Sequence, residues 1–152
     1  MALVRGFEFP DDLFYLMEHD TWARTEPDGT LTVGLTALGA HISGDFLEFL
    51  PKPPGTVVDR ERAFGMLEMS KTLRSARAPA SGTIVAINEG VKREPMLVNR
   101  EPYAAGWLVK MQPQDWARDA ALLVTGAAIA AAALNYMTLH LVHEFSEALP
   151  PE

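Results

Sequence analysis

Short stretches of alternating hydrophobic and polar residues, each closed by glycine or proline, fill the middle of the chain. Alternation predicts β-strands, because successive side chains of a strand point to opposite faces. Pro27-Asp28-Gly29 and Pro53-Pro54-Gly55 are typical of turns, as is 78–82, since proline presets φ and glycine accepts positive φ. The strands expected between the turns are 31–35, 45–50, 63–69, 72 to about 77, 83–88 and 107–111. Short strands at this spacing favour a compact β-sandwich or barrel.

The two ends of the chain have residue patterns that differ from that of the middle. Residues 7–12 combine a proline with paired acids, which suits a loop or the start of a helix. The apolar run 13–16 fits either a strand or a helical turn.

Residues 115–148 are helical by composition. Asp115 can cap the helix start, and a break near Gly126 is possible. The side chains that can share one broad helical face are Leu122, Ile129, Ala133, Met137 and Leu141.

These patterns divide the chain into three parts. We expect an N-terminal segment at 1–14, a β-domain at 15–112 and a helical extension at 113–152 that packs on the β-domain. The uncharged stretch 120–142 is long enough to span a membrane, but it consists mostly of alanine. A helix lying on the protein body is therefore the preferred interpretation. The N-terminus has no signal-peptide pattern, so a cytoplasmic protein that makes no membrane contact is expected.

Composition removes several classes of function. The 152 residues carry a formal net charge of −7, which argues against a nucleic-acid binder because phosphate binding needs a basic surface. The chain contains no cysteine, so disulfides, thiolate metal sites and cysteine nucleophiles are excluded. Trp22, Trp107 and Trp116 are then expected to pack in the core or at its edge rather than to stack on bases.

Motifs of known enzymes are also missing. The chain has neither a phosphate-binding loop nor a GxSxG nucleophile motif. His140 and His143 are three residues apart and could face one metal ion, but no third ligand stands at a suitable spacing. We expect helix-surface histidines there, no metal site and no catalytic residue.

One lysine stands at an informative position. In Glu68-Met69-Ser70-Lys71-Thr72 it lies between two expected strands, where a tight hairpin would expose it. By itself, a lysine in a turn is usually a solvated charge. The residues around it change this interpretation.

The ordered set of motifs resembles the glycine cleavage H protein and related lipoyl carriers. The matching pieces are Thr32-Val33-Gly34-Leu35-Thr36, Gly44-Asp45, Leu50-Pro51 with Gly55, Gly65 and Glu68 before Lys71, Ala78-Pro79 with Ser81-Gly82, Val85, Asn88-Glu89, Pro95, Leu97-Val98-Asn99, Pro102-Tyr103 and Gly106-Trp107-Leu108. They cover about 15–111, and their joint order is far more specific than any one piece. The resemblance implies a mainly β, lipoyl-domain-like fold, a barrel-sandwich hybrid.

The resemblance also implies a cofactor. Lys71 would carry lipoic acid in amide linkage, and the attachment enzyme, a lipoate ligase or lipoyl transferase, would read Glu68 and Gly82. A chain without thiols would thus present a dithiolane on a swinging arm, with a reach on the order of 14 Å, to several partner enzymes. The protein would be a carrier and not a catalyst.

Two departures from the family pattern bear on the pathway. The chain has His19-Asp20-Thr21-Trp22 where members usually have Thr-His-Glu-Trp, and Ser75 where they commonly have aspartate. Those family acids lie near the aminomethylated arm, where a carboxylate favours the protonated amine. Thr21, Ser75 and also Ser70 are therefore candidates for residues near the arm.

The departures favour a second branch, the lipoate-binding proteins of heterodisulfide-reductase-like sulfur oxidation, which tend to have a turn like Pro51-Lys52-Pro53-Pro54-Gly55. The partners would then be a heterodisulfide-reductase-like complex and a dihydrolipoamide dehydrogenase. The alternative is the aminomethyl carrier of the glycine cleavage system, with glycine decarboxylase and aminomethyltransferase as partners. A third alternative is an interaction module that is not lipoylated. The presence of Glu68, Lys71 and Gly82 together argues against it.

Overall fold

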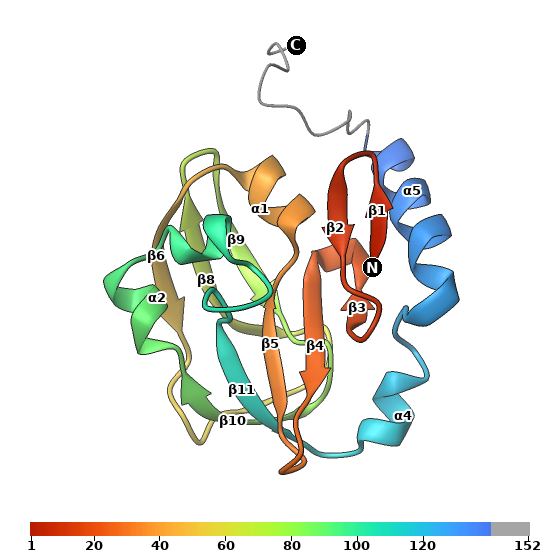
Figure 1. Cartoon of the computed structure of the whole chain (residues 1–152). Helices are drawn as coiled ribbons and strands as arrows, with labels where there is room; N and C mark the ends of the chain where they lie inside the picture. Colours follow the sequence, from red (N-terminus) through yellow and green to blue (C-terminus); the bar gives the residue numbers. More distant parts are fainter. Residues whose placement is uncertain (141–152) are drawn as a thin grey trace.

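Two antiparallel sheets form the body of the protein (Figure 1). The structure is a computed structural model that describes residues 1–140. The larger sheet has the strand order β3-β4-β5-β11-β10-β7, with bounds Phe14–Leu16, Thr21–Thr25, Leu31–Leu35, Val109–Pro113, Gly82–Ile87 and Val57–Val58. The smaller sheet has the order β6-β8-β9, with bounds Phe46–Pro51, Ala63–Met69 and Thr72–Arg77. The expected mainly β fold is confirmed, and each strand predicted from alternation is present.

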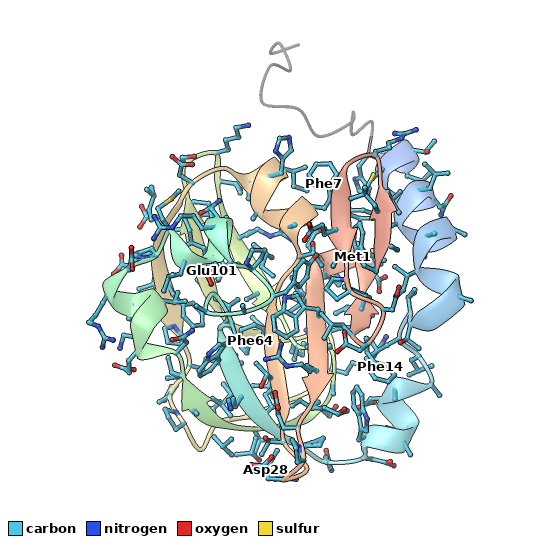
Figure 2. The ribbon with its side chains drawn as sticks, viewed as in Figure 1. Met1, Phe7, Phe14, Asp28, Phe64 and Glu101 are labelled. Atoms are coloured by element: carbon cyan, nitrogen blue, oxygen red, sulfur yellow. The ribbon has the colours of Figure 1, made fainter. Side chains whose placement is uncertain are left out.

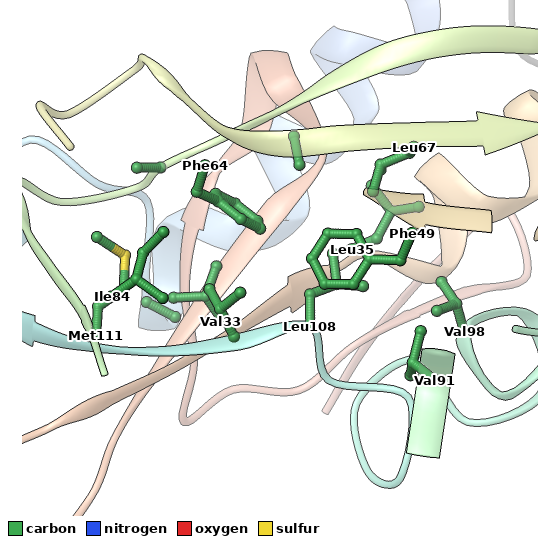
Figure 3. Packing of buried hydrophobic residues seen from close by; sticks show 14 of the residues in the cluster. Val33, Leu35, Phe49, Phe64, Leu67, Ile84, Val91, Val98, Leu108 and Met111 are labelled. Atoms are coloured by element: carbon green, nitrogen blue, oxygen red, sulfur yellow. The ribbon is translucent and has the colours of Figure 1, made fainter. Parts of the chain in front are cut away.

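The core lies between these two sheets. Val33 and Ile84 come from the larger sheet, and Phe64 and Leu67 from the smaller one (Figure 3). All four are completely buried. Phe49 packs edge-to-face on Phe64, with ring centroids 6.5 Å apart. This shared core fixes the smaller sheet, and with it the β8–β9 hairpin, against the larger one.

The N-terminus forms a third, two-stranded sheet that the sequence pattern did not predict. β1 (Ala2–Val4) pairs with β2 (Phe7–Phe9), so the expectation of a loop or helix start at 7–12 is wrong for 7–9, whereas 10–12 form a loop as expected. Phe7 and Phe9 are buried on one face of β2, and Glu8 between them is exposed. With only three residues in each strand, the alternation is too short to be recognised.

Three short helices were also not predicted from the sequence. α1 (Ala37–Ser43) begins where the Thr36 hydroxyl accepts a hydrogen bond from the Gly39 N–H. α2 (Glu89–Arg93) and α3 (Leu97–Arg100) lie between β10 and β11. Elements of four to seven residues are too short to show a helical period.

The C-terminal region is helical in two pieces. α4 (Trp116–Ala120) begins at Asp115, whose side chain accepts from the Arg118 N–H, and this confirms the predicted cap. The predicted break at Gly126 is also confirmed, because the 3-10 helix η2 (Gly126–Ala128) precedes α5 (Ile129–Leu139). Between the two pieces the chain turns at 121–123, and Tyr15 and Val124 then exchange two backbone hydrogen bonds.

α5 packs on the N-terminal hairpin in a second apolar cluster. Ile129, Ala133 and Met137 are buried there, as expected, whereas Leu122 is 61% exposed and its neighbour Leu123 is buried instead. The register of the expected face is therefore wrong at Leu122, because that residue lies in the turn that follows α4 and not in a helix. Leu141 and His143 lie outside the described residues. Among residues 1–140, no helix is long and apolar enough to cross a membrane.

The three tryptophan side chains pack in or against the two apolar clusters. Trp22 is completely buried in the second cluster, and its indole N–H donates to the Leu35 carbonyl at 3.0 Å. Trp107 and Trp116 are half-buried and pack against the two clusters. This confirms packing as the role of the three side chains.

Candidate functional site

Lys71 lies at the tip of the β8–β9 hairpin. Met69 pairs with Thr72, so the loop contains only Ser70 and Lys71, and both are exposed. Within residues 1–140 the Lys71 amine has no ion-pair partner. The hairpin expected from the alternation is present, while the role of Lys71 stays a prediction.

The end of α1 and the connection to β6 are hydrogen-bonded to this hairpin tip. The Lys71 N–H donates to the Ser43 carbonyl at 3.1 Å, and the Ser70 N–H donates to the Asp45 carbonyl at 2.8 Å. The Ser70 hydroxyl accepts from the Asp45 N–H, also at 2.8 Å. Three hydrogen bonds therefore fix the backbone that carries Lys71.

Gly44 makes this close approach possible. Its φ is +87°, in the region that side chains rarely adopt. A Cβ at this position would lie 2.2 Å from the Ser70 Oγ and 3.1 Å from the Lys71 Cγ. Only glycine fits between the helix end and the hairpin tip.

Asn99 of α3 anchors the same connection from the other side. Its amide oxygen accepts from the Phe46 N–H at 2.8 Å, and its amide nitrogen donates to the Gly44 carbonyl at 3.0 Å. Two sets of hydrogen bonds therefore position Lys71: Asn99 holds the 44–46 connection, and the residues of that region hold the hairpin tip.

A cavity of about 740 Å³ opens beside Lys71. Its walls come from 6–8 of the N-terminal hairpin, from α1, from the hairpin tip and from 99–104. Tyr103 fastens two of these walls together, because its hydroxyl donates to the Glu8 carbonyl at 2.6 Å and accepts from the Ala37 N–H. The cavity depends on parts of the chain that are far apart in sequence.

His41 of α1 is the imidazole in this cavity. Phe7 points from β2 toward α1 (Figure 2), and its ring meets the His41 ring edge-to-face at 5.1 Å. Burial lowers the pKa of His41, and the nearby Lys71 charge lowers it further. The charge on Lys71 is thus linked to the protonation of His41.

A buried ion pair lies on the other side of the hairpin. Arg74 of β9 donates to the Asp20 carboxylate at 3.0 Å and to the Ser43 hydroxyl at 3.0 Å. Tyr136 of α5 also donates to Asp20, at 3.1 Å. Burial raises the pKa of Asp20, while the Arg74 charge opposes that rise. Asp20 is bonded to both partners, and these contacts join the β8–β9 hairpin to α1 and α5.

The structure brings only one of the three near-arm candidates next to Lys71. Ser70 is its neighbour in the loop, but Thr21 is completely buried and its hydroxyl donates to the Arg77 carbonyl. Ser75 lies opposite Met66 on the outer face of the small sheet, with its hydroxyl 3.6 Å from the Met66 sulfur.

The two residues expected to be read by the attachment enzyme are separated. Glu68 is exposed on β8, three residues from the lysine. Gly82 is buried at the start of β10 in the other sheet, where a Cβ would lie 2.3 Å from the Gln112 carbonyl oxygen. Close packing of β10 on β11 is thus a structural reason for glycine at 82.

Sequence reasoning missed four side chains around the tip: Asn99 as an anchor, His41, Arg74 and Tyr103. No local signal could have found them, because each acts on residues of another element. The ion pair of Asp20 with Arg74 likewise joins positions 54 residues apart. Residues 1–140 contain no group of three side chains arranged to hold a metal ion.

Comparisons with known proteins agree with this geometry. Residues 13–135 match the family model described as "Glycine cleavage H-protein". The glycine cleavage system H protein of Cronobacter sakazakii is 41% identical over 119 residues, covering 78% of this chain and 91% of the relative. Glycine cleavage system H protein 2 of Aquifex aeolicus is 37% identical over 122 residues, covering 80% of this chain and 76% of the relative.

A solved structure shows the same fold. The crystal structure of a glycine cleavage system H protein from Mycobacterium marinum aligns with a TM-score of 0.69 at 28% identity, covering 87% of this chain and 98% of the other. The β1–β2 hairpin, which forms one wall of the cavity, precedes the family-matched segment 13–135.

Proposed function

The chain belongs to the glycine cleavage H-protein family, and on that premise we propose that it is a lipoyl carrier with its arm on the Nζ of Lys71. The observation that supports this proposal is the hairpin tip, an exposed lysine on a two-residue loop whose backbone is held by three hydrogen bonds. A fixed base with a free amine suits an arm that must be acylated and must then reach several enzymes. In this role the protein is a substrate of its partners and not a catalyst.

The residues at the tip fit a lipoyl group. The amine is exposed, and the adjacent cavity of about 740 Å³ is large enough for a small ring at the end of the arm. When bound, the group supplies a disulfide that can be reduced and loaded. The chain supplies the attachment atom, the rigid base and the cavity wall.

For the pathway, we propose the glycine cleavage system, in which the arm carries an aminomethyl group between glycine decarboxylase and aminomethyltransferase. The names of the similar proteins from Cronobacter and Aquifex support this assignment. Once Lys71 is acylated, the cavity wall has three carboxylates, those of Glu8, Asp45 and Glu101, against one guanidinium, that of Arg100, and this excess also favours a positively charged load.

Sulfur oxidation with a heterodisulfide-reductase-like partner is the second candidate, and one observation favours it. No carboxylate comes from positions 21 and 75, since Thr21 is buried and Ser75 lies on the outer face. The adjacent acid, Asp20, is already paired with Arg74. Positions 20, 21 and 75 therefore offer no unpaired carboxylate to a protonated amine.

Attachment is tested with Lys71→Arg and Lys71→Ala in a host that lipoylates its own carriers. Intact mass should show one lipoyl group on the wild-type protein and none on either variant. The free energy of unfolding should change by less than about 0.5 kcal/mol, because an exposed hairpin lysine contributes little to folding. A lipoyl group on the Lys71→Ala protein would refute the assignment of the site.

The pathway is tested by carrier exchange with purified glycine decarboxylase. We expect the lipoylated wild-type protein to support exchange at a rate within about tenfold of the Cronobacter carrier, which is about 1.4 kcal/mol in barrier height. Exchange at background level, with fully lipoylated protein, would move the assignment to the sulfur-oxidation candidate.

A further inference from the structure

The outer face of the small sheet is open to solvent. Residues that lie directly opposite each other in antiparallel strands share a face, so Glu48, Glu68 and Leu73 form one row across β6, β8 and β9. Leu50, Met66 and Ser75 form the next row. Leu73 is 62% exposed and Leu50 is 47% exposed. Two leucines of the sheet thus face water close to the hairpin that carries Lys71.

This row contains a repulsive pair. Glu48 and Glu68 are cross-strand partners, and neither carboxylate has an ion-pair partner within the described part of the chain. Like charges placed directly opposite each other destabilise a sheet. A like-charged cross-strand pair does not stabilise the sheet, and a cation that approaches both carboxylates offsets their repulsion.

The geometry at Lys71 limits which partner meets this face. An enzyme that works on the loaded arm meets its far end, on the order of 14 Å from the backbone of Lys71. The enzyme that attaches the lipoyl group has to bring its reacting carbonyl to the Nζ atom itself. It therefore covers the hairpin and the strand residues that flank it.

We propose that this face, made by Glu48, Leu50, Glu68 and Leu73, is the docking surface for the enzyme that acylates Lys71. The enzyme presents a cationic side chain, which an arginine fork suits best, to the two carboxylates of Glu48 and Glu68. An apolar surface of the enzyme covers Leu50 and Leu73, which removes their exposed area from water. This inference rests on the proposed lipoyl attachment, and it adds Glu48, Leu50 and Leu73 to the recognition of Glu68.

The test is steady-state lipoylation of the purified carrier by a lipoate ligase with lipoate and ATP. Glu48→Gln should raise the KM for the carrier three- to tenfold and leave kcat unchanged, because the variant loses charge at the docking surface and not at the reacting atoms. The same variant should unfold at a slightly higher temperature than the wild type, since the repulsion is gone. Raising NaCl should increase the KM of the wild type more than that of Glu48→Gln.

Matched controls separate docking from general surface effects. Leu3 is 68% exposed and lies opposite Glu8 on the N-terminal hairpin, so Leu3→Thr is the counterpart of Leu73→Thr. Glu18 is exposed and belongs to the 3-10 helix Met17–His19 rather than to the small sheet, so Glu18→Gln is the counterpart of Glu48→Gln. Only the variants of the small sheet should raise KM.

The outcomes are distinct. A KM for Glu48→Gln and Leu73→Thr within twofold of the wild type, with the wild type fully modified, would overturn this inference and leave the lipoyl carrier standing. No modification of the wild type at all would overturn the proposed function, and this inference with it. A dimer in sedimentation that Leu73→Thr dissociates would assign the face to a second copy of the chain instead.

Discussion

Residues 1–140 contain two hairpins with two-residue loops, and the tips of these hairpins are stabilised in different ways. In the β1–β2 hairpin, Arg5 and Gly6 both have positive φ, 49° and 86°, which is the combination that a type I′ turn requires. In the β8–β9 hairpin, Ser70 and Lys71 are not among the residues with positive φ. The first loop therefore has the backbone that matches the twist of its strands, and the second does not.

The tip of the β8–β9 hairpin is stabilised by residues outside the hairpin. Its tip is bonded to Ser43 and Asp45, which Asn99 in turn holds in place. A loop closed by its own backbone geometry would present a fixed turn whatever surrounds it. The loop that carries Lys71 instead depends on residues 25 or more positions away, so changes remote from the lysine can alter how it is presented.

The largest effect is expected at Gly44. Gly44→Ala should lower the free energy of unfolding by about 2–4 kcal/mol, because the alanine has an unfavourable positive φ and its Cβ collides with the Ser70 Oγ. Chemical denaturation measures this change. Lipoylation of Lys71 should slow as well, since the tip loses its support.

Gly29→Ala is the matched control for backbone strain. Gly29 also has positive φ, +88°, but nothing lies within 4 Å of a Cβ there, so the cost should be about 1 kcal/mol with normal lipoylation. In the double variant Gly44→Ala with Ser70→Ala, part of the loss should be recovered because the colliding oxygen is gone. If Gly44→Ala and Gly29→Ala lower the free energy of unfolding by the same amount, the hairpin tip is not in tight contact with Gly44.

The comparison of the hairpins also explains what could be predicted from the sequence. The strands β5, β8 and β10 alternate over five to seven residues, so local pattern was sufficient for them. The β8–β9 hairpin followed from the strands on either side of Lys71. The β1–β2 hairpin was missed because its strands have three residues each, although its buried Phe7 and Phe9 do alternate with Glu8.

The contacts around the tip could not be predicted from the sequence, because they are made between elements. Nothing near Asn99 indicates that its side chain reaches the 44–46 connection, 53 residues earlier for the Phe46 N–H. The cavity requires the N-terminal hairpin to meet 99–104, and Tyr103 joins them only in the folded chain. The resemblance to a family identified Lys71, and the fold then shows what positions it.

A smaller effect is expected at Asn99. Asn99→Ala should cost about 2 kcal/mol, because it removes two hydrogen bonds and leaves the Phe46 N–H and the Gly44 carbonyl without that partner. Amide hydrogen exchange should accelerate at Ser70 and Lys71 and stay unchanged in the β1–β2 hairpin. Asn135→Ala, at an exposed position of α5, serves as the control and should be neutral within about 0.5 kcal/mol. Unchanged amide hydrogen exchange at Ser70 and Lys71 would contradict the inference that Asn99 stabilises the hairpin tip through the 44–46 connection.

The smallest effect concerns His41, and it follows from the charge at the tip. Burial and the Lys71 charge lower the pKa of His41 in the folded protein. Below the ordinary histidine pKa of about 6.5, the unfolded chain therefore binds more protons at this site, and stability falls as the pH is lowered through that range. Acylation turns the lysine into a neutral amide. The charged side chains that then remain in the cavity wall are Glu8, Asp45, Arg100 and Glu101.

Lipoylation should therefore raise the pKa of His41 and reduce the loss of stability on acidification. Titration of the imidazole by NMR in the unmodified and lipoylated proteins measures the shift directly. Lys71→Gln removes the charge without adding an arm and should shift the His41 pKa in the same direction, whereas Lys71→Arg keeps the charge and should leave it where it is. If Lys71→Gln and Lys71→Arg titrate alike, the tip charge does not reach the cavity, and burial alone sets the protonation of His41.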